Sequence, residues 1–136
     1  MQDVERLSES EALVLAGLLR QMIRADGRFT TEERQALSHV ALEIAVGPPP
    51  ADAIGEVALY ALMDRAAQKF ATDGALRAAA STVTRPEIRA AIHAMLFEVA
   101  ASDTITVNEA QVLDWLAETW ELEAPRDLEG EKTDVG

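Results

Sequence analysis

The sequence contains no cysteine, which excludes disulfides, thiolate metal sites and a cysteine nucleophile. Histidine occurs only at His39 and His93, so a histidine-rich metal site and an HExxH helix are excluded as well. Basic residues number 12 against 24 acidic ones, and the net charge is −12. A chain this acidic repels nucleic-acid phosphates and anionic lipid surfaces, so neither is predicted as a partner.

The signatures of common enzymes are also missing. The sequence has no GxSxG nucleophile turn, no Walker glycine–lysine loop and no GxGxxG phosphate loop. These absences predict a protein that is not an enzyme. One catalytic alternative stays open, a small hydrolase that uses a pair of carboxylates, and it requires a sizeable pocket that contains both acids.

Long hydrophobic runs are absent too. No stretch approaches the roughly 20 apolar residues that a membrane-spanning helix needs. The first eleven residues are acidic and polar, unlike the basic start and apolar run of a signal peptide. We therefore predict a cytoplasmic protein without direct membrane insertion.

Good helix formers dominate the composition, with 25 alanines among 136 residues, and no strand-like alternation appears. Gly47 followed by prolines 48–50 predicts a helix stop and a stiff linker. Four segments begin with a hydroxyl residue three positions before a glutamate, the pattern of a capping box. The four pairs are Ser8/Glu11, Thr30/Glu33, Thr84/Glu87 and Thr106/Glu109.

Apolar residues then recur at spacings of three and four, which predicts an all-α bundle of about six to seven helices. A central helix is expected over 52–71, ended by Asp73-Gly74, with a short alanine-rich turn after it. The segments on either side of this helix correspond at offsets of 76 and 77 residues, which indicates two pseudo-repeated helix–loop–helix units. The matched apolar pairs are Leu15/Ile92, Leu18/Met95, Leu19/Leu96, Met22/Val99, Leu37/Leu113, Val40/Leu116 and Ile44/Trp120. We expect one domain over residues 1–122 and an acidic, disordered tail over 123–136.

The two interhelical loops share an unusual feature. Asp26 and Asp103 each stand near the end of a predicted helix, where the helix dipole disfavours a negative charge. A glutamate, Glu33 or Glu109, follows in the first turn of the next helix. An aspartate and a glutamate brought together across such a loop would supply hard oxygen ligands for Ca²⁺, Mg²⁺ or Mn²⁺. The spacing does not fit the standard EF-hand, and a structural role as capped turns explains the glutamates equally well.

The same loops resemble the TerB-like domain of bacterial tellurite-resistance proteins. The resemblance extends over residues 11–122, and it implies a compact bundle of about seven helices. It also implies a divalent-cation site formed by acidic loop residues, and a role in stress-response or membrane-associated complexes rather than in catalysis. The motif residues are Ala25, Asp26, Gly27, Phe29, Glu33 and Leu37, repeated as Asp103, Ile105, Glu109 and Leu113, with Asp26, Glu33, Asp103 and Glu109 as the implied metal ligands.

A second functional class remains open. The protein can equally be a metal-free interaction module that docks an unidentified protein partner through its acidic surface or tail, because six acids lie between Glu121 and Gly136. His39 and His93 are interpreted as surface or core residues without a functional role. Trp115 and Trp120 are expected to pack or anchor the last helix.

Overall fold

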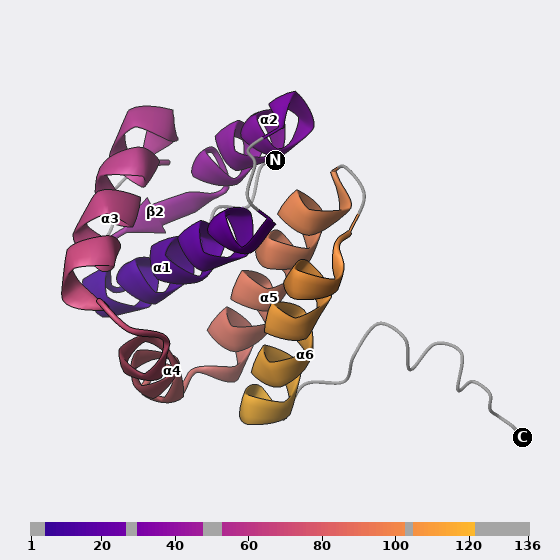
Figure 1. Ribbon diagram of the computed structural model, residues 1–136. Helices are drawn as coiled ribbons and strands as arrows, with labels where there is room; N and C mark the ends of the chain where they lie inside the picture. Colours follow the sequence, from indigo (N-terminus) through magenta and orange to yellow (C-terminus); the bar gives the residue numbers. More distant parts are fainter. Residues whose placement is uncertain (1–4, 27–29, 48–52, 103–104, 122–136) are drawn as a thin grey trace, which may run out of the picture.

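The computed structural model describes residues 5–26, 30–47, 53–102 and 105–121, and these residues form a helical bundle (Figure 1). The predicted all-α class is confirmed, with six helices in the described part of the chain. Their order is β1 (Glu5–Leu7), α1 (Glu9–Asp26), α2 (Thr31–Ala41), β2 (Ile44–Val46), α3 (Gly55–Lys69), α4 (Asp73–Ser81), α5 (Pro86–Ala101) and α6 (Val107–Trp120). The predicted tail, residues 123–136, lies outside the described residues.

Helix α1 occupies the centre of the bundle in space, although α3 is the central helix in sequence order. Every residue from Glu11 to Leu19 is buried, and α1 packs against α3, α4, α5 and α6. Helix α2 packs on α3 and α5, and α5 lies beside α6 (Figure 1). The apolar pairs that suggested the repeat are all buried in this common core. Helical spacing accounts for all of them except Ile44, which lies in β2.

Two short strands were not anticipated. β1 and β2 pair in parallel, with Glu5 opposite Ile44 and Leu7 opposite Val46. Each strand has three residues, which is too short to show the period-two alternation that identifies a strand in sequence. The pairing also shortens the second helix, which ends at Ala41 rather than continuing to Gly47, so Ile44 lies in a strand and not on a helix face.

Three of the four predicted capping boxes are present. Ser8, Thr30 and Thr106 each accept a hydrogen bond from the backbone N–H of the glutamate three residues on, and that glutamate accepts one from the cap N–H. The capping box predicted at Thr84/Glu87 does not form, so this prediction is wrong. Pro86 is the first residue of α5, so the N-cap is Arg85 and Glu87 lies one position too early for a capping box.

The turn predicted at Asp73-Gly74 is also wrong. These two residues begin α4, a nine-residue helix, and the Thr72 hydroxyl caps it by accepting from the Ala75 N–H at 3.1 Å. An Asp-Gly pair favours a turn locally, but the cap hydroxyl just before it and the alanines after it favour a helix.

We expect the caps to differ measurably in stability. Thr30→Ala and Thr106→Ala should each lower the free energy of unfolding by about 1 kcal/mol, because each removes the acceptor of a helix N-terminal N–H. Thr84→Ala is the matched control, since Thr84 is exposed and caps nothing. Urea denaturation measures all three, and a Thr84→Ala loss as large as the other two would contradict this assignment.

Candidate metal centre

The structure describes the side chains of two of the four predicted loop ligands. Glu33 and Glu109 lie in the first turns of α2 and α6 and are 1% and 0% exposed. Asp26 is the last residue of α1, but its side chain, like the whole of Asp103, is outside the described residues. Whether the aspartates approach the glutamates therefore stays a prediction.

Each buried glutamate already serves its helix cap. Glu33 Oε1 accepts from the Thr30 N–H at 3.1 Å, and Glu109 Oε1 accepts from the Thr106 N–H at 2.9 Å. These hydrogen bonds fix both carboxylates at the ends of the interhelical loops, at equivalent positions of the two units. The capping role is thus confirmed, and it uses one oxygen of each carboxylate.

A different group of metal-ligand atoms lies between α2 and α5. His39 projects from α2, Glu43 follows the end of that helix, and Glu98 projects from α5. One ligand atom from each lies within 4.8 Å of the other two. His39 Nδ1 is 2.5 Å from Glu98 Oε2 and 3.6 Å from Glu43 Oε2. We call these three residues the His39 cluster.

The charges of this cluster influence one another. The hydrogen bond that His39 donates to Glu98 raises the pKa of His39, and the negative charges of Glu43 and Glu98 act in the same direction. Burial raises the pKa of Glu43, the nearby charge of Glu98 adds to this, and His39 opposes it. Because the carboxylates of Glu43 and Glu98 repel each other, a positive charge between them is favoured.

Sequence reasoning missed this cluster. The i, i+4 spacing of His39 and Glu43 is visible in the sequence and could have suggested a pair. Glu98 lies 59 residues beyond His39, and only the packing of α2 against α5 brings it near. His93, in contrast, behaves as predicted: it is buried, and its Nε2 donates to the carbonyl of Leu113 at 3.2 Å.

A shallow groove of about 440 Å³ adjoins the His39 cluster between α2 and α5. Glu98 belongs to the His39 cluster and also lines the groove. Glu32, Gln35 and Phe97 are among the other residues that line it. Neither this groove nor the cavity between α1, α3 and α4 contains Glu33 or Glu109. Neither of these two hollows is therefore the pocket around the loop carboxylates that the hydrolase alternative requires.

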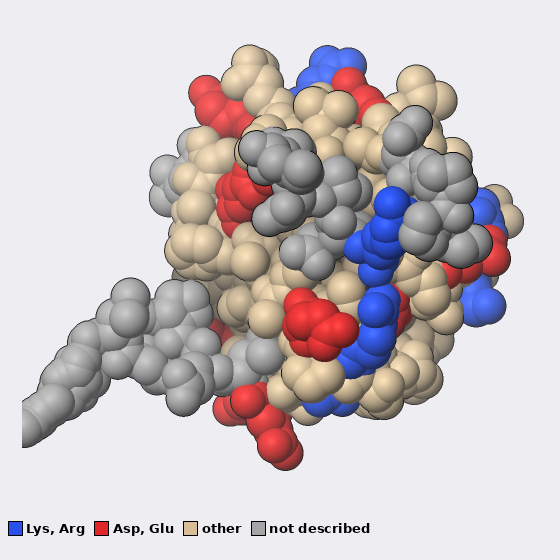
Figure 2. All heavy atoms as spheres, turned by 180° about the vertical axis from the view of Figure 1, so that it is seen from behind, with Lys and Arg blue, Asp and Glu red and all other residues tan. Residues whose placement is uncertain are grey.

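The excess of acid is not gathered on one face in the view of Figure 2. Basic and acidic side chains are interspersed there, and several basic side chains form a run that is flanked by carboxylates (Figure 2). This face, as far as it is described, is therefore mixed in charge although the chain carries −12.

Searches of curated proteins and of solved structures find no match to this chain. Within the described part of the chain, no helix combines the length and apolar character that crossing a bilayer requires. The model of the family described as tellurite resistance protein TerB matches residues 12–129, which confirms the resemblance noted in the loops. Since this match covers most of the 136 residues, the chain belongs to the TerB family.

Proposed function

We propose that this TerB-family domain binds a divalent cation, and that the His39 cluster holds it. The observation that carries the proposal is that His39 Nδ1 and one carboxylate oxygen each from Glu43 and Glu98 lie within 4.8 Å of one another. The three ligands come from two packed helices and the turn after one of them, so the fold holds their backbone positions close together.

The two distances from His39 Nδ1 to the carboxylate oxygens are near those between ligands of one metal ion. Two ligands on a tetrahedral ion with bonds of about 2.0–2.1 Å lie about 3.3 Å apart. The 2.5 Å contact between His39 and Glu98 must open by less than 1 Å, and the 3.6 Å contact to Glu43 is already close. A metal ion would replace the hydrogen bond between His39 and Glu98.

The ligand types indicate which ion is preferred. Imidazole nitrogen suits Zn²⁺ and other transition metals, whereas carboxylates also bind Mg²⁺, Ca²⁺ and Mn²⁺. One imidazole with two carboxylates therefore favours Zn²⁺ or Mn²⁺ over Ca²⁺. The loop set predicted from sequence, Asp26, Glu33, Asp103 and Glu109, contains only oxygen ligands and would favour Ca²⁺ or Mg²⁺. The two ligand sets therefore differ in the metal they would select.

Calorimetric titration of the metal-stripped protein with Zn²⁺, Mn²⁺, Ca²⁺ and Mg²⁺ tests the proposal. We expect saturable Zn²⁺ or Mn²⁺ binding that His39→Gln and Glu98→Gln each weaken by about tenfold or more. Glu9→Gln is the matched control, because it removes an exposed carboxylate that pairs with Arg65 on another surface. Unchanged Zn²⁺ and Mn²⁺ binding in the His39 and Glu98 variants would exclude the His39 cluster.

Two further outcomes distinguish the alternatives. Ca²⁺ or Mg²⁺ binding that only Asp26→Asn and Asp103→Asn weaken would assign the cation to the loops instead. The absence of any binding at millimolar ion would reject cation binding and favour the metal-free interaction module. Deletion of residues 123–136 would then be the first test of partner capture.

A further inference from the structure

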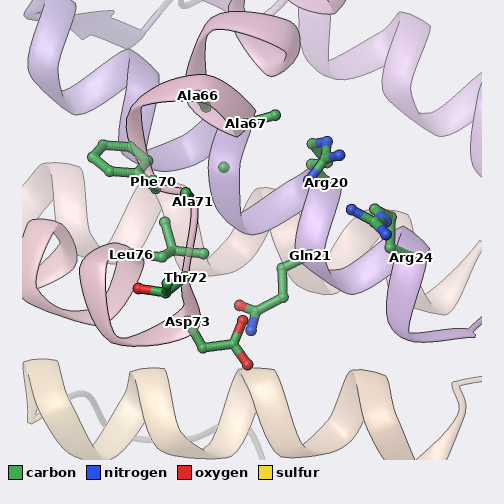
Figure 3. Close-up of a pocket in the computed structure, with 11 residues that line it drawn as sticks. Arg20, Gln21, Arg24, Ala66, Ala67, Phe70, Ala71, Thr72, Asp73 and Leu76 are labelled. Atoms are coloured by element: carbon green, nitrogen blue, oxygen red, sulfur yellow. The ribbon is translucent and has the colours of Figure 1, made fainter.

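A cavity of about 360 Å³ lies between α1, the end of α3 and the start of α4, on elements that do not carry the His39 cluster (Figure 3). Its volume is at the lower end of the range for small-molecule pockets. The cavity plays no part in the proposed cation binding, so its occupant has to be inferred from its own lining.

One part of the lining is apolar and depends on a glycine. Gly17 of α1 faces Leu76 and Phe70, and a Cβ at this position would lie 2.9 Å from Leu76 Cδ1 and 3.3 Å from Phe70 Cδ2. Only glycine lets α1 approach these side chains this closely without a shift. Ala66 and Ala67 complete this apolar part of the lining with small side chains (Figure 3).

A second part of the lining is basic. Arg20 and Arg24 lie one helical turn apart on α1 and both line the cavity. Among the residues that the structure describes, neither arginine has a carboxylate within ion-pair distance, although acids outnumber basic residues two to one. Two adjacent guanidinium groups that pair with no described carboxylate make a carboxylate the favoured binding group beside them.

A third part of the lining holds a hydrogen-bond acceptor that has no described partner. Gln21 Oε1 is buried and has no donor among the described residues, and a buried acceptor without a partner is costly. The Gln21 side chain points toward Asp73, which lines the cavity from the first turn of α4 (Figure 3). The part of the cavity near Gln21 and Asp73 therefore favours a ligand group that donates an O–H or N–H.

We propose that this cavity binds a small organic acid: a carboxylate at one end, an apolar body, and a hydroxyl or amino donor near the carboxylate. The carboxylate pairs with Arg20 and Arg24, and the apolar body packs on Phe70 and Leu76. The donor hydrogen-bonds to Gln21 Oε1 once the Gln21 side chain turns this oxygen into the cavity. Asp73 accepts from the same donor and disfavours a bare polyanion such as phosphate, which carries more charge and has no apolar part.

The test uses the full chain, labelled with ¹⁵N, and four probes that each carry part of the recognition. 3-Phenyllactate has the carboxylate, the hydroxyl and an apolar ring; 3-phenylpropionate lacks the hydroxyl; 2-phenylethanol lacks the carboxylate; inorganic phosphate lacks the apolar body. We expect 3-phenyllactate to give saturable shifts of backbone amides in segments 17–24 and 70–76. Phenylpropionate should bind about three- to tenfold more weakly, since one hydrogen bond is lost. Phenylethanol and phosphate should give no saturable shifts.

Variants identify the groups that act. The double variant Arg20→Gln/Arg24→Gln should weaken both aromatic acids by about tenfold or more, and Arg34→Gln, which removes an exposed arginine of α2, should not. Gln21→Met keeps the side-chain length but removes the acceptor, so it should abolish the preference for phenyllactate over phenylpropionate while both still bind.

Three results would overturn the proposal. The first is the absence of saturable shifts with phenyllactate in these segments. The second is an equal loss of binding in Arg34→Gln, which would indicate general charge attraction. The third is phosphate binding at least as tightly as phenyllactate, which would make the cavity a simple anion site.

Discussion

Trp120→Ala should lower the free energy of unfolding by about 3–5 kcal/mol. Trp120 ends α6 and is 3% exposed, and its Nε1 donates to the carbonyl of Ala80 in α4 at 2.9 Å. The guanidinium of Arg89, on α5, lies 6.0 Å from the centre of its ring. Because this one side chain joins α6 to α4 and α5, its truncation leaves a cavity where three helices meet. Urea denaturation measures the loss.

The other tryptophan provides a control on the same helix. Trp115 is only partly buried, Arg77 lies 4.8 Å from its ring, and its Nε1 is buried with no acceptor among the described residues. Trp120→Phe removes a hydrogen bond and should cost about 1 kcal/mol beyond the change in ring size. Trp115→Phe removes a donor that bonds to nothing described and should cost less or even stabilise. Equal losses in the two phenylalanine variants would contradict the role assigned to the Trp120 N–H.

Arg85→Gln should lower stability by about 1–3 kcal/mol at neutral pH. Arg85 Nε and Nη2 donate to the two oxygens of Glu11 at 3.0 and 2.7 Å, and Nη2 also donates to the carbonyl of Arg6 at 2.9 Å. The side chain of Glu11 is 11% exposed, so loss of Arg85 would leave a largely buried carboxylate without its cation. The pair joins the start of α5 to the capping box of α1, 74 residues apart in the sequence.

The pH dependence of this effect has a definite sign. The hydrogen bond from Arg85 is the largest cause of a lowered pKa of Glu11, whose ordinary value is 4.5, and burial opposes it. A carboxyl whose pKa is lower in the folded state binds fewer protons when folded, so its contribution to stability is complete above the ordinary value. It is lost as the pH falls through the lowered pKa. The difference between wild type and Arg85→Gln should therefore be largest at neutral pH and shrink below pH 4.5.

Arg65→Gln is the matched comparison. Arg65 Nη2 lies 2.5 Å from Glu9 Oε2, but the two side chains are 54% and 64% exposed. An exposed pair of this kind gains little from its attraction in water, so stability should not change measurably. A loss as large as that of Arg85→Gln would show that burial is not what makes the Glu11 pair important.

Helix starts are predictable from the sequence where their signal is local. The boxes at Ser8, Thr30 and Thr106 depend on residues three apart, and the chain forms them as predicted. At Thr84 the proline at the first helical position moved the start by one residue, and the cap position passed to Arg85. That residue then pairs with Glu11 across the bundle, a contact that no local pattern indicates.

The candidate sites also differ in whether a local sequence pattern or a contact between distant residues forms them. The burial of Glu33 and Glu109 follows from their capping boxes, but the His39 cluster requires α2 to pack against α5. The two strands depend on a pairing between residues about 39 positions apart, which their three-residue lengths do not reveal. The cavity beside Arg20 and Arg24 requires α3 and α4 to form its opposite wall. Only contacts distant in sequence create these features.

The packing of α1 on α3 and α6, and of α2 on α3 and α5, also bears on how such a chain could have evolved. Each helix of the first unit has its main partners in the second unit or in the helix that joins the two. A single helix–loop–helix unit would therefore expose the faces that are buried here, and a second copy of it would not replace α3, the main partner of both α1 and α2. An ancestor would therefore have needed the joining helix as well as the repeated unit to bury these faces within one chain.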